Sequence, residues 1–131
     1  MERKTLISST IIKFIKKSNT PVSFHDIKDE LLTKNLNPNK STIYRIIDKL
    51  LIKKEISQIT SKTGTNYYEN NNNHHHHHFI CNTCKNAFCL KSCHIHSLNI
   101  NLNNLLPNSE FQIESHDFNL YGKCDKCSNK D

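Results

Sequence analysis

Long apolar runs are missing from the 131-residue sequence. No stretch of about 18 or more apolar residues offers a membrane-spanning helix, and the opening residues MERKTLISSTII lack the long apolar region of a signal peptide. We therefore expect a soluble, cytoplasmic chain without a membrane partner. No nucleophile stands in a pattern with a general base, so we expect neither an enzyme nor a small-molecule substrate other than metal ions.

A chain of this length forms one domain or two small ones, and a small domain has a thin hydrophobic core. Such a core needs support from a metal ion, a disulfide or a partner chain. The sequence contains six cysteines. In a reducing compartment, cysteines are metal ligands or redox thiols more often than members of a disulfide framework, which favours support by a metal.

Charge and metal-binding residue types divide the chain into two halves. Residues 1–68 carry 13 Lys and Arg against 6 Asp and Glu, whereas residues 69–131 carry 5 against 6. The basic half is therefore a candidate for contact with phosphates. All six cysteines and all nine histidines except His25 fall in the other half, and an Asn run at residues 70–73 marks the boundary.

The basic half has the pattern of three helices. Apolar residues recur at helical spacing in residues 5–17 and again in residues 40–51. Between them, Ser23 and Asp26 resemble a capping box at the start of a shorter helix. The residues predicted to form the buried face of that short helix are Ile27, Leu31 and Leu32.

A hairpin is predicted after the third helix. Residues 56–60 and 66–69 have strand character, and Gly64 supplies the positive φ that the turn between them needs. Three helices and a basic hairpin predict a winged helix-turn-helix, in which the third helix enters the major groove of DNA. The polar side of that helix carries Lys40, Tyr44, Arg45 and Lys49. On charge alone, a solvated helix surface is an equal alternative.

Two Cys-x-x-Cys pairs give the strongest chemical pattern. Cys81 and Cys84 form the first pair, and Cys124 and Cys127 form the second. Two such knuckles bring four thiolates into a tetrahedron around zinc, which holds together a fold with little core. A closed four-sulfur site has no open coordination position, so we assign it a structural role. Disulfides are the alternative.

Two further cysteines, Cys89 and Cys93, stand outside this pattern. At a spacing of four they share a helix face, form a redox pair or are simply buried small apolar residues. We expect the last of these three arrangements.

Five consecutive histidines, residues 74–78, run directly into the first cysteine pair. Their mid-chain position argues against a purification tag, whereas low-complexity sequence is an alternative. If the run continues the strand that includes Phe79 and Ile80, alternate side chains point to opposite faces, and one strand serves two metal sites. One face then carries His75 and His77, and the other carries His74, His76 and His78. Further ligands available in the chain are Glu69, His96 and His116.

Four stretches together carry a family resemblance. They are STIYRIIDKL at residues 41–50, which matches a T-V-Y-R recognition helix, YYE at residues 67–69, the histidines before Cys81, and YGKC at residues 121–124 leading to Cys127. From about residue 5 to residue 128, the sequence resembles the ferric uptake regulator (Fur) family of metalloregulators.

The resemblance implies an α+β chain with three parts. Residues 1–69 would form an N-terminal winged helix-turn-helix DNA-binding domain, residues 70–78 a hinge and His-rich metal-binding strand, and residues 79–131 a small α/β dimerisation domain with a four-cysteine zinc site. It implies a repressor that binds a palindromic double-stranded DNA operator as a metal-loaded homodimer. The DNA contacts carried over by position are Lys40, Ser41, Thr42, Tyr44 and Arg45.

The resemblance also implies three metal sites. The structural zinc would be held by Cys81, Cys84, Cys124 and Cys127. The hinge regulatory site would comprise Glu69, His76 and His78. The second site, inside the dimerisation domain, would comprise His75, His77, His96 and His116. A further hinge histidine that the family frequently supplies is replaced here by Pro21, and His25 lies four residues on.

No cysteine precedes Cys81, where zinc sensors of the family often place a regulatory thiolate. We therefore expect Fe²⁺ at the regulatory site, with Mn²⁺, Ni²⁺ and Zn²⁺ as alternatives, beside the structural Zn²⁺. Two other functions stay open. A peroxide or redox sensor of the same architecture would use His76, His78 or the pair Cys89 and Cys93. A His-rich metal storage or delivery protein would lack salt-dependent, sequence-selective DNA affinity.

Overall fold

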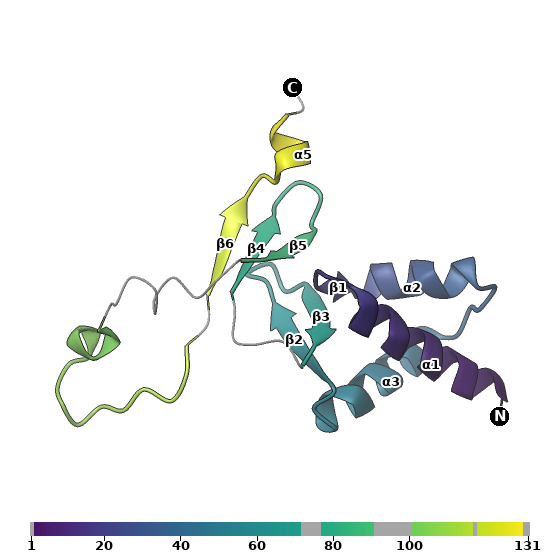
Figure 1. The fold of residues 1–131 in the computed structure, drawn as a ribbon, viewed down its shortest axis with the longest axis horizontal. Helices are drawn as coiled ribbons and strands as arrows, with labels where there is room; N and C mark the ends of the chain where they lie inside the picture. Colours follow the sequence, from purple (N-terminus) through teal and green to yellow (C-terminus); the bar gives the residue numbers. More distant parts are fainter. Residues whose placement is uncertain (1, 72–76, 91–100, 117, 130–131) are drawn as a thin grey trace.

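The computed structural model describes residues 2–71, 77–90, 101–116 and 118–129. The helices are α1 (Glu2–Lys17), α2 (Phe24–Thr33), α3 (Lys40–Ile52), the 3-10 helix η1 (Leu102–Leu105) and α5 (Asp125–Ser128). The strands are β1 (Val22–Ser23), β2 (Ile56–Thr60), β3 (Asn66–Asn70), β4 (His78–Cys81), β5 (Ala87–Cys89) and β6 (Asn119–Gly122). Helices α1 to α3 gather at one end of the molecule, beside the sheets (Figure 1). None of the described helices is long and apolar enough to cross a membrane.

A hydrophobic core forms where α1, α2 and α3 meet. Each helix contributes residues spaced three or four apart, which keeps their side chains on one face. The buried members are Ile7, Ile11 and Ile15 of α1, Ile27 and Leu31 of α2, and Ile43, Ile47 and Leu50 of α3. The prediction that Leu32 is buried is wrong, because its side chain is 46% exposed. Leu32 follows Leu31 directly and therefore lies about 100° around the helix from the buried stripe.

Helix α2 begins at a capping box, as the sequence predicts. Oγ of Ser23 accepts a hydrogen bond from the Asp26 backbone N–H at 3.3 Å, and Oδ2 of Asp26 accepts one from the Ser23 N–H at 3.0 Å. The two bonds satisfy backbone donors that the first turn of a helix leaves without partners. Ser23 also pairs with Tyr67 in the first sheet, so the cap ties α2 to that sheet.

We expect Ser23→Ala to lower the free energy of unfolding by about 1 kcal/mol, because the Asp26 N–H loses its partner. Urea denaturation followed by circular dichroism should show a lower midpoint with an unchanged slope. Asn39→Ala is the matched control, since Asn39 precedes α3 but makes no side-chain capping hydrogen bond. Equal losses in the two variants would contradict the assigned role of the cap.

The first sheet has the strand order β1-β3-β2, and both pairs are antiparallel. Strands β2 and β3 form a hairpin, which we call the wing, in a register that pairs Ile56 with Asn70 and Thr60 with Asn66. Gly64 in its turn has a φ of 92°, which confirms the predicted need for glycine there. Three helices followed by this hairpin make the predicted winged helix-turn-helix.

The second sheet has the strand order β5-β4-β6, with β4 antiparallel to β5 and parallel to β6. Parallel strands require a long connection, and here it runs from Cys81 to Asn119 and includes β5. The register pairs Cys81 with Gly122, which brings the same ends of β4 and β6 side by side. Together with the helical half, the two small sheets give the predicted α+β class.

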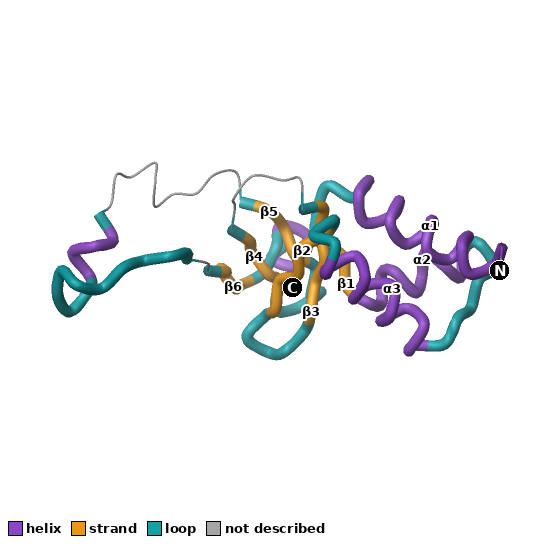
Figure 2. The backbone as a smooth tube through the Cα atoms, turned by 90° about the horizontal axis from the view of Figure 1, so that it is seen from below, coloured by secondary structure: helices purple, strands orange, loops and turns teal. Residues whose placement is uncertain are grey.

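The wing packs against the second sheet, and Figure 2 shows these strands close together. A small buried cluster joins them, and its members are Tyr67, Ile80 and Ala87. Oη of Tyr67 donates a hydrogen bond to the carbonyl of Lys85 at 2.7 Å. At the tip of the wing, the Lys62 N–H donates to Oη of Tyr121 at 2.8 Å. The wing is therefore in direct contact with the half of the chain that carries the cysteine pairs.

Candidate metal centres and nucleic-acid interface

The two Cys-x-x-Cys pairs meet at one end of the second sheet. Cys81 is the last residue of β4 and Cys124 follows β6 by two residues, so the parallel pairing brings them together. A tight turn after the first cysteine of each pair brings the second cysteine close to it. In these turns the Lys85 N–H donates to the Cys81 carbonyl and the Ser128 N–H donates to the Cys124 carbonyl. The four Sγ atoms all lie within 4.8 Å of one another.

This four-sulfur cluster has dimensions that suit zinc. Two sulfurs bonded at about 2.3 Å to one tetrahedral ion are about 3.8 Å apart. The Sγ atoms of Cys84 and Cys124 are 3.8 Å apart. All five cysteines that the structure describes are free thiols, so none of them forms the disulfides that were the alternative. The donor set and its spacing therefore fit a structural zinc ion.

Two thiols of this cluster, Cys81 and Cys127, have pKa values shifted in opposite directions. The backbone N–H groups of Cys84 and Cys124 each donate to Sγ of Cys81 at 3.4 Å, and these bonds lower the pKa of Cys81 to about 5. Burial and the neighbouring sulfurs raise the pKa of Cys127 to about 12. Four thiolates at this separation repel one another, so all four ionise together only when a cation lies among them.

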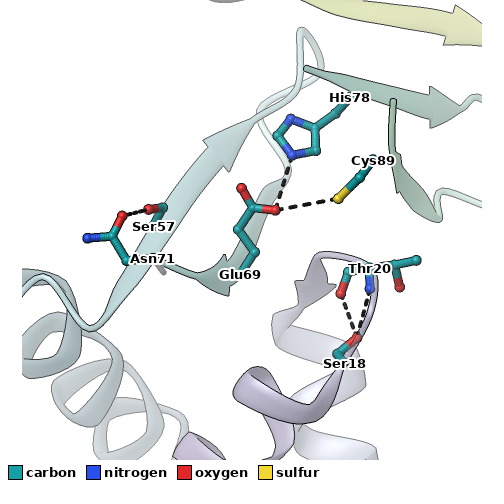
Figure 3. Close-up of polar contacts among 7 residues, drawn as sticks. All are labelled: Ser18, Thr20, Ser57, Glu69, Asn71, His78 and Cys89. Carbon is teal, nitrogen blue, oxygen red and sulfur yellow. Dashed lines mark hydrogen bonds and ion pairs between the residues drawn. The ribbon is translucent and has the colours of Figure 1, made fainter. Parts of the chain in front are cut away.

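A second cluster lies between the wing and the second sheet, and we call it the hinge cluster: Glu69, His78 and Cys89. Nε2 of His78 is 3.2 Å from Oε2 of Glu69, and Sγ of Cys89 is 3.7 Å from the same oxygen. The three ligand atoms lie within 4.8 Å of one another. Figure 3 shows the side chains converging. Oxygen, nitrogen and sulfur donors in this arrangement fit a divalent first-row metal.

Strand pairing explains why these three residues meet. His78 and Cys89 are directly opposed across the antiparallel pair β4 and β5, so their side chains leave the sheet on the same side. In β3, Tyr67 and Glu69 are two residues apart and share a face. That face is turned toward the second sheet, because Tyr67 packs on Ile80 there, whereas Tyr68 belongs to the helical core.

Cys89 is a candidate ligand that the sequence pattern did not reveal, since a buried apolar residue was expected ahead of a shared helix face or a redox pair. The structure corrects this, because Cys89 is half-buried and its sulfur faces the Glu69 carboxylate. Burial, together with the negative charge of Glu69, raises the pKa of Cys89 to about 11. The thiol is therefore protonated at neutral pH until a cation approaches it. The signal that could have revealed Cys89 is the register of a hairpin folded around the first Cys-x-x-Cys pair, which places position 89 opposite His78.

The other predicted hinge residues divide between described and undescribed parts of the chain. Of the three ligands predicted for this site, the structure brings together Glu69 and His78, whereas His76 lies outside the described residues. His25 is exposed, and its ring lies beside Phe24 with the centroids 6.4 Å apart. His25 is not a member of the hinge cluster. Cys93 also lies outside the described residues, so its predicted arrangements with Cys89 do too.

Two of the four residues predicted for the second site are described, and they are close together. The rings of His77 and His116 have centroids 5.0 Å apart, and His77 is only 1% exposed. The predicted residues outside the described ranges are His75 and His96. Although His77 and His78 are adjacent in the chain, the His77 ring lies beside His116 whereas His78 contacts the Glu69 carboxylate. A cavity of about 390 Å³ is lined by His77, His116 and the hinge residues Glu69 and His78.

Helix α3 turns a polar face outward. Its predicted DNA contacts are all exposed or partly exposed, and they are Lys40, Ser41, Thr42, Tyr44 and Arg45. The Tyr44 ring stacks on Phe24 with centroids 4.8 Å apart, and Nζ of Lys40 lies 5.7 and 6.0 Å from the two ring centroids. Phe24, which the sequence pattern did not single out, therefore orients Tyr44. Cationic and aromatic groups on one exposed face suit contact with phosphates and bases.

Comparison with known proteins identifies a family and solved structures that this chain resembles. The model of the Ferric uptake regulator family matches residues 3–121. The Helicobacter pylori ferric uptake regulator Fur, whose structure has three functional metal binding sites, is 22% identical, with a TM-score of 0.73 over 99% of this chain and 82% of that one. The Francisella tularensis ferric uptake regulator with iron is 22% identical, with a TM-score of 0.76 over 94% and 92% of the two chains.

A regulator of a different stimulus has the same fold. The Campylobacter jejuni peroxide stress regulator is 17% identical, with a TM-score of 0.66 over 96% of this chain and 92% of that one. No sequence among the curated proteins matches the chain. At these identities the structural likeness establishes a shared fold and leaves the metal and the stimulus to chemical argument.

Proposed function

Because the chain belongs to the ferric uptake regulator family, we propose that it is a metal-responsive transcriptional repressor that binds a palindromic DNA operator as a metal-loaded homodimer. One observation carries this proposal. The hinge cluster draws Glu69 from the wing of the DNA-binding half and His78 from the second sheet, so a metal held there bridges the two halves of the chain. We propose His76 as a further ligand.

A metal in this bridging position would favour the arrangement in which the two halves of the chain lie against each other. When bound, a divalent ion supplies positive charge that the carboxylate and imidazole donors share. Glu69 and His78 approach to 3.2 Å only while the wing lies against the second sheet. A ligand shifts a conformational equilibrium only through its difference in affinity for the two states. A site divided between two sheets has such a difference, because separating the sheets removes part of the donor set.

The experiment that tests the proposal is a mobility-shift titration. The protein, with zinc retained and weakly bound ions removed, is titrated against a palindromic duplex that the metal-loaded protein has selected from a random pool. Each divalent first-row metal is added in turn. We expect shifted DNA only with a regulatory metal present and only with the selected duplex. Binding that does not depend on metal would overturn the proposed function.

We expect Arg45→Ala to abolish sequence-specific binding, because Arg45 is exposed on the face of α3 that would enter the major groove. A lost bidentate base contact costs about 1–3 kcal/mol. Lys53→Ala is the matched control at the end of the same helix. It should weaken binding to all sequences modestly and lower the salt slope by about 1. Fluorescence anisotropy with the selected and a scrambled duplex, across a salt series, measures both effects.

Equal losses on the selected and scrambled duplexes from both variants would contradict the assignment of α3 as the recognition helix. The further contacts that we propose on this helix are Lys40, Ser41, Thr42 and Tyr44. Phe24→Ala should act through Tyr44, because it removes the ring on which Tyr44 stacks.

We also propose the homodimer and the three-part division into residues 1–69, 70–78 and 79–131. Support for the dimer comes from large apolar side chains that the described part of the second half leaves exposed, namely Leu105, Phe111, Ile113 and Leu120. A second copy of the chain would cover such side chains. Light scattering after size-exclusion chromatography measures the oligomeric state.

The structural zinc site and a second metal site at His77 and His116, with His75 and His96, complete the proposal. The two alternative functions stay predictions. A metal storage protein would not require the outward cationic face of α3. The peroxide-sensing alternative is tested in the same titration by adding peroxide to the metal-loaded protein, where it predicts loss of DNA binding.

A further inference from the structure

We propose that Cys89 is a metal ligand of the hinge cluster and makes that site prefer Zn²⁺ over Mn²⁺ and Fe²⁺. The inference deepens the proposed function and rests on it only where it assigns a regulatory role to this site. It gives Cys89 a chemical role in place of the apolar one that the sequence pattern predicts.

The geometry supports direct ligation. A tetrahedral ion bonded to sulfur at about 2.3 Å and to oxygen at about 2.0 Å holds these two atoms about 3.5 Å apart, and nitrogen and oxygen donors about 3.3 Å apart. The sulfur of Cys89 is 3.7 Å from Oε2 of Glu69, and Nε2 of His78 is 3.2 Å from it. The cluster therefore matches both spacings without a change of backbone.

The strand register makes this placement specific. Cys89 is directly opposite His78 in the antiparallel pair of β4 and β5, so the thiol and the imidazole leave the sheet on one side. The preceding residue, Phe88, leaves on the opposite side and packs against the four-sulfur cluster. Shifting the register by one residue would exchange the two faces and remove the thiol from the hinge.

Donor chemistry then sets the metal preference. Thiolate is a soft ligand that favours zinc, whereas carboxylate and water suit manganese, and affinity for divalent ions rises from Mn²⁺ through Fe²⁺ toward the later metals. On binding, the Cys89 S–H bond breaks, the sulfur keeps the electron pair and bonds the metal, and the proton goes to solvent. The expectation of Fe²⁺ was drawn from the absence of a cysteine before Cys81, and it is revised here because a thiolate donor comes from Cys89 instead.

A purely structural role makes a different prediction. In that role Cys89 only fills space and donates a weak hydrogen bond to Glu69, and Ser replaces it with little change in metal binding. The two roles are separated by a spectroscopic readout of sulfur ligation, because Co²⁺ bound to thiolate has a charge-transfer absorption band in the near ultraviolet and Co²⁺ bound to oxygen and nitrogen alone lacks it.

The experiment uses the full chain with zinc retained in the four-cysteine site, which metal analysis verifies. Co²⁺ is titrated into the wild type, Cys89→Ser and Cys89→Glu, and the affinities for Zn²⁺ and Mn²⁺ are then measured by chelator competition without DNA. Ser57→Ala is the control variant, because Ser57 pairs with Glu69 across the wing while its hydroxyl contacts Asn71 (Figure 3). Circular dichroism establishes that each variant is folded.

We expect the thiolate band in the wild type and in Ser57→Ala, and its loss in both Cys89 variants. The ratio of Zn²⁺ to Mn²⁺ affinity should fall at least about tenfold in Cys89→Glu. Removing a residue that only hydrogen-bonds to a metal ligand already lowers metal affinity by about tenfold or more, and the loss of a ligand should have at least that effect. A band that persists in Cys89→Ser, or an unchanged ratio in Cys89→Glu, overturns the inference. If the band and ratio change as expected but DNA binding ignores the metal, the ligand assignment stands and the proposed function falls.

Discussion

Cys81→Ser and Cys124→Ser are each expected to release the structural zinc and to abolish both the fold of the second half and the dimer. Zinc bound to such sites contributes apparent free energy on the order of 10 kcal/mol, which is folding free energy because the unfolded chain has no preformed site. The second sheet has little to replace it. It contributes only Ile80 and Ala87 to the buried cluster that it shares with Tyr67 of the wing, and the cysteines themselves form the other cluster of buried residues.

Native mass spectrometry measures the zinc content, and size-exclusion chromatography with circular dichroism measures the dimer and the fold. Cys89→Ser is the matched control, because Cys89 lies in the same sheet but outside the four-sulfur cluster, so this variant should keep its structural zinc and its fold. A folded, zinc-free dimer of Cys81→Ser would refute the structural role of the cluster.

Glu69→Ala is expected to remove the response of operator binding to metal. Glu69 is the member of the hinge cluster that comes from the wing, so its loss leaves the remaining donors on one side of the junction. Coupling between two sites is typically about 1–3 kcal/mol, so affinity for the operator at saturating metal should fall about 5- to 150-fold. Affinity without metal should be unchanged, because the substitution leaves the face of α3 intact.

A histidine series supplies the controls for Glu69→Ala. His76→Ala should resemble it, whereas His75→Ala and His77→Ala should mainly weaken the second site and reduce metal sensitivity less steeply. His74→Ala should have the smallest effect. Metal titrations of operator binding by fluorescence anisotropy rank the variants. Identical behaviour of Glu69→Ala and the four histidine variants would mean that the run is low-complexity sequence and that the division into two sites is wrong.

Local features of the fold were predictable because they depend on neighbours in the chain. The helices follow from apolar spacing, the cap of α2 from Ser23 and Asp26, and the turn of the wing from Gly64. The edge of the buried stripe on α2 was harder to predict from the sequence, since Leu31 and Leu32 are both leucines and differ only in their angle around the helix axis. The role of Phe24 depends on its stacking with Tyr44 from another helix, which periodicity does not contain.

The candidate site shows the same division. The two cysteine pairs are recognisable from spacing alone, because short-range turns bring each pair together. The contact of Cys89 with Glu69 was not predictable from spacing, because it depends on the register of β5 against β4 and on the packing of the wing against that sheet. The contact between Glu69 and His78 depends on the packing of two separate sheets, which a local pattern does not specify.

The parallel pairing of β4 with β6 has a consequence for the length of the chain between them. With Cys84 and Cys124 in one cluster, the residues between form a closed loop. The entropy cost of closing a flexible loop grows only with the logarithm of its length, so doubling it adds about 0.6 kcal/mol. That cost is small beside zinc binding on the order of 10 kcal/mol. We therefore expect zinc binding by the two cysteine pairs to tolerate insertions and deletions in this connection, outside β5 and the proposed ligands His96 and His116.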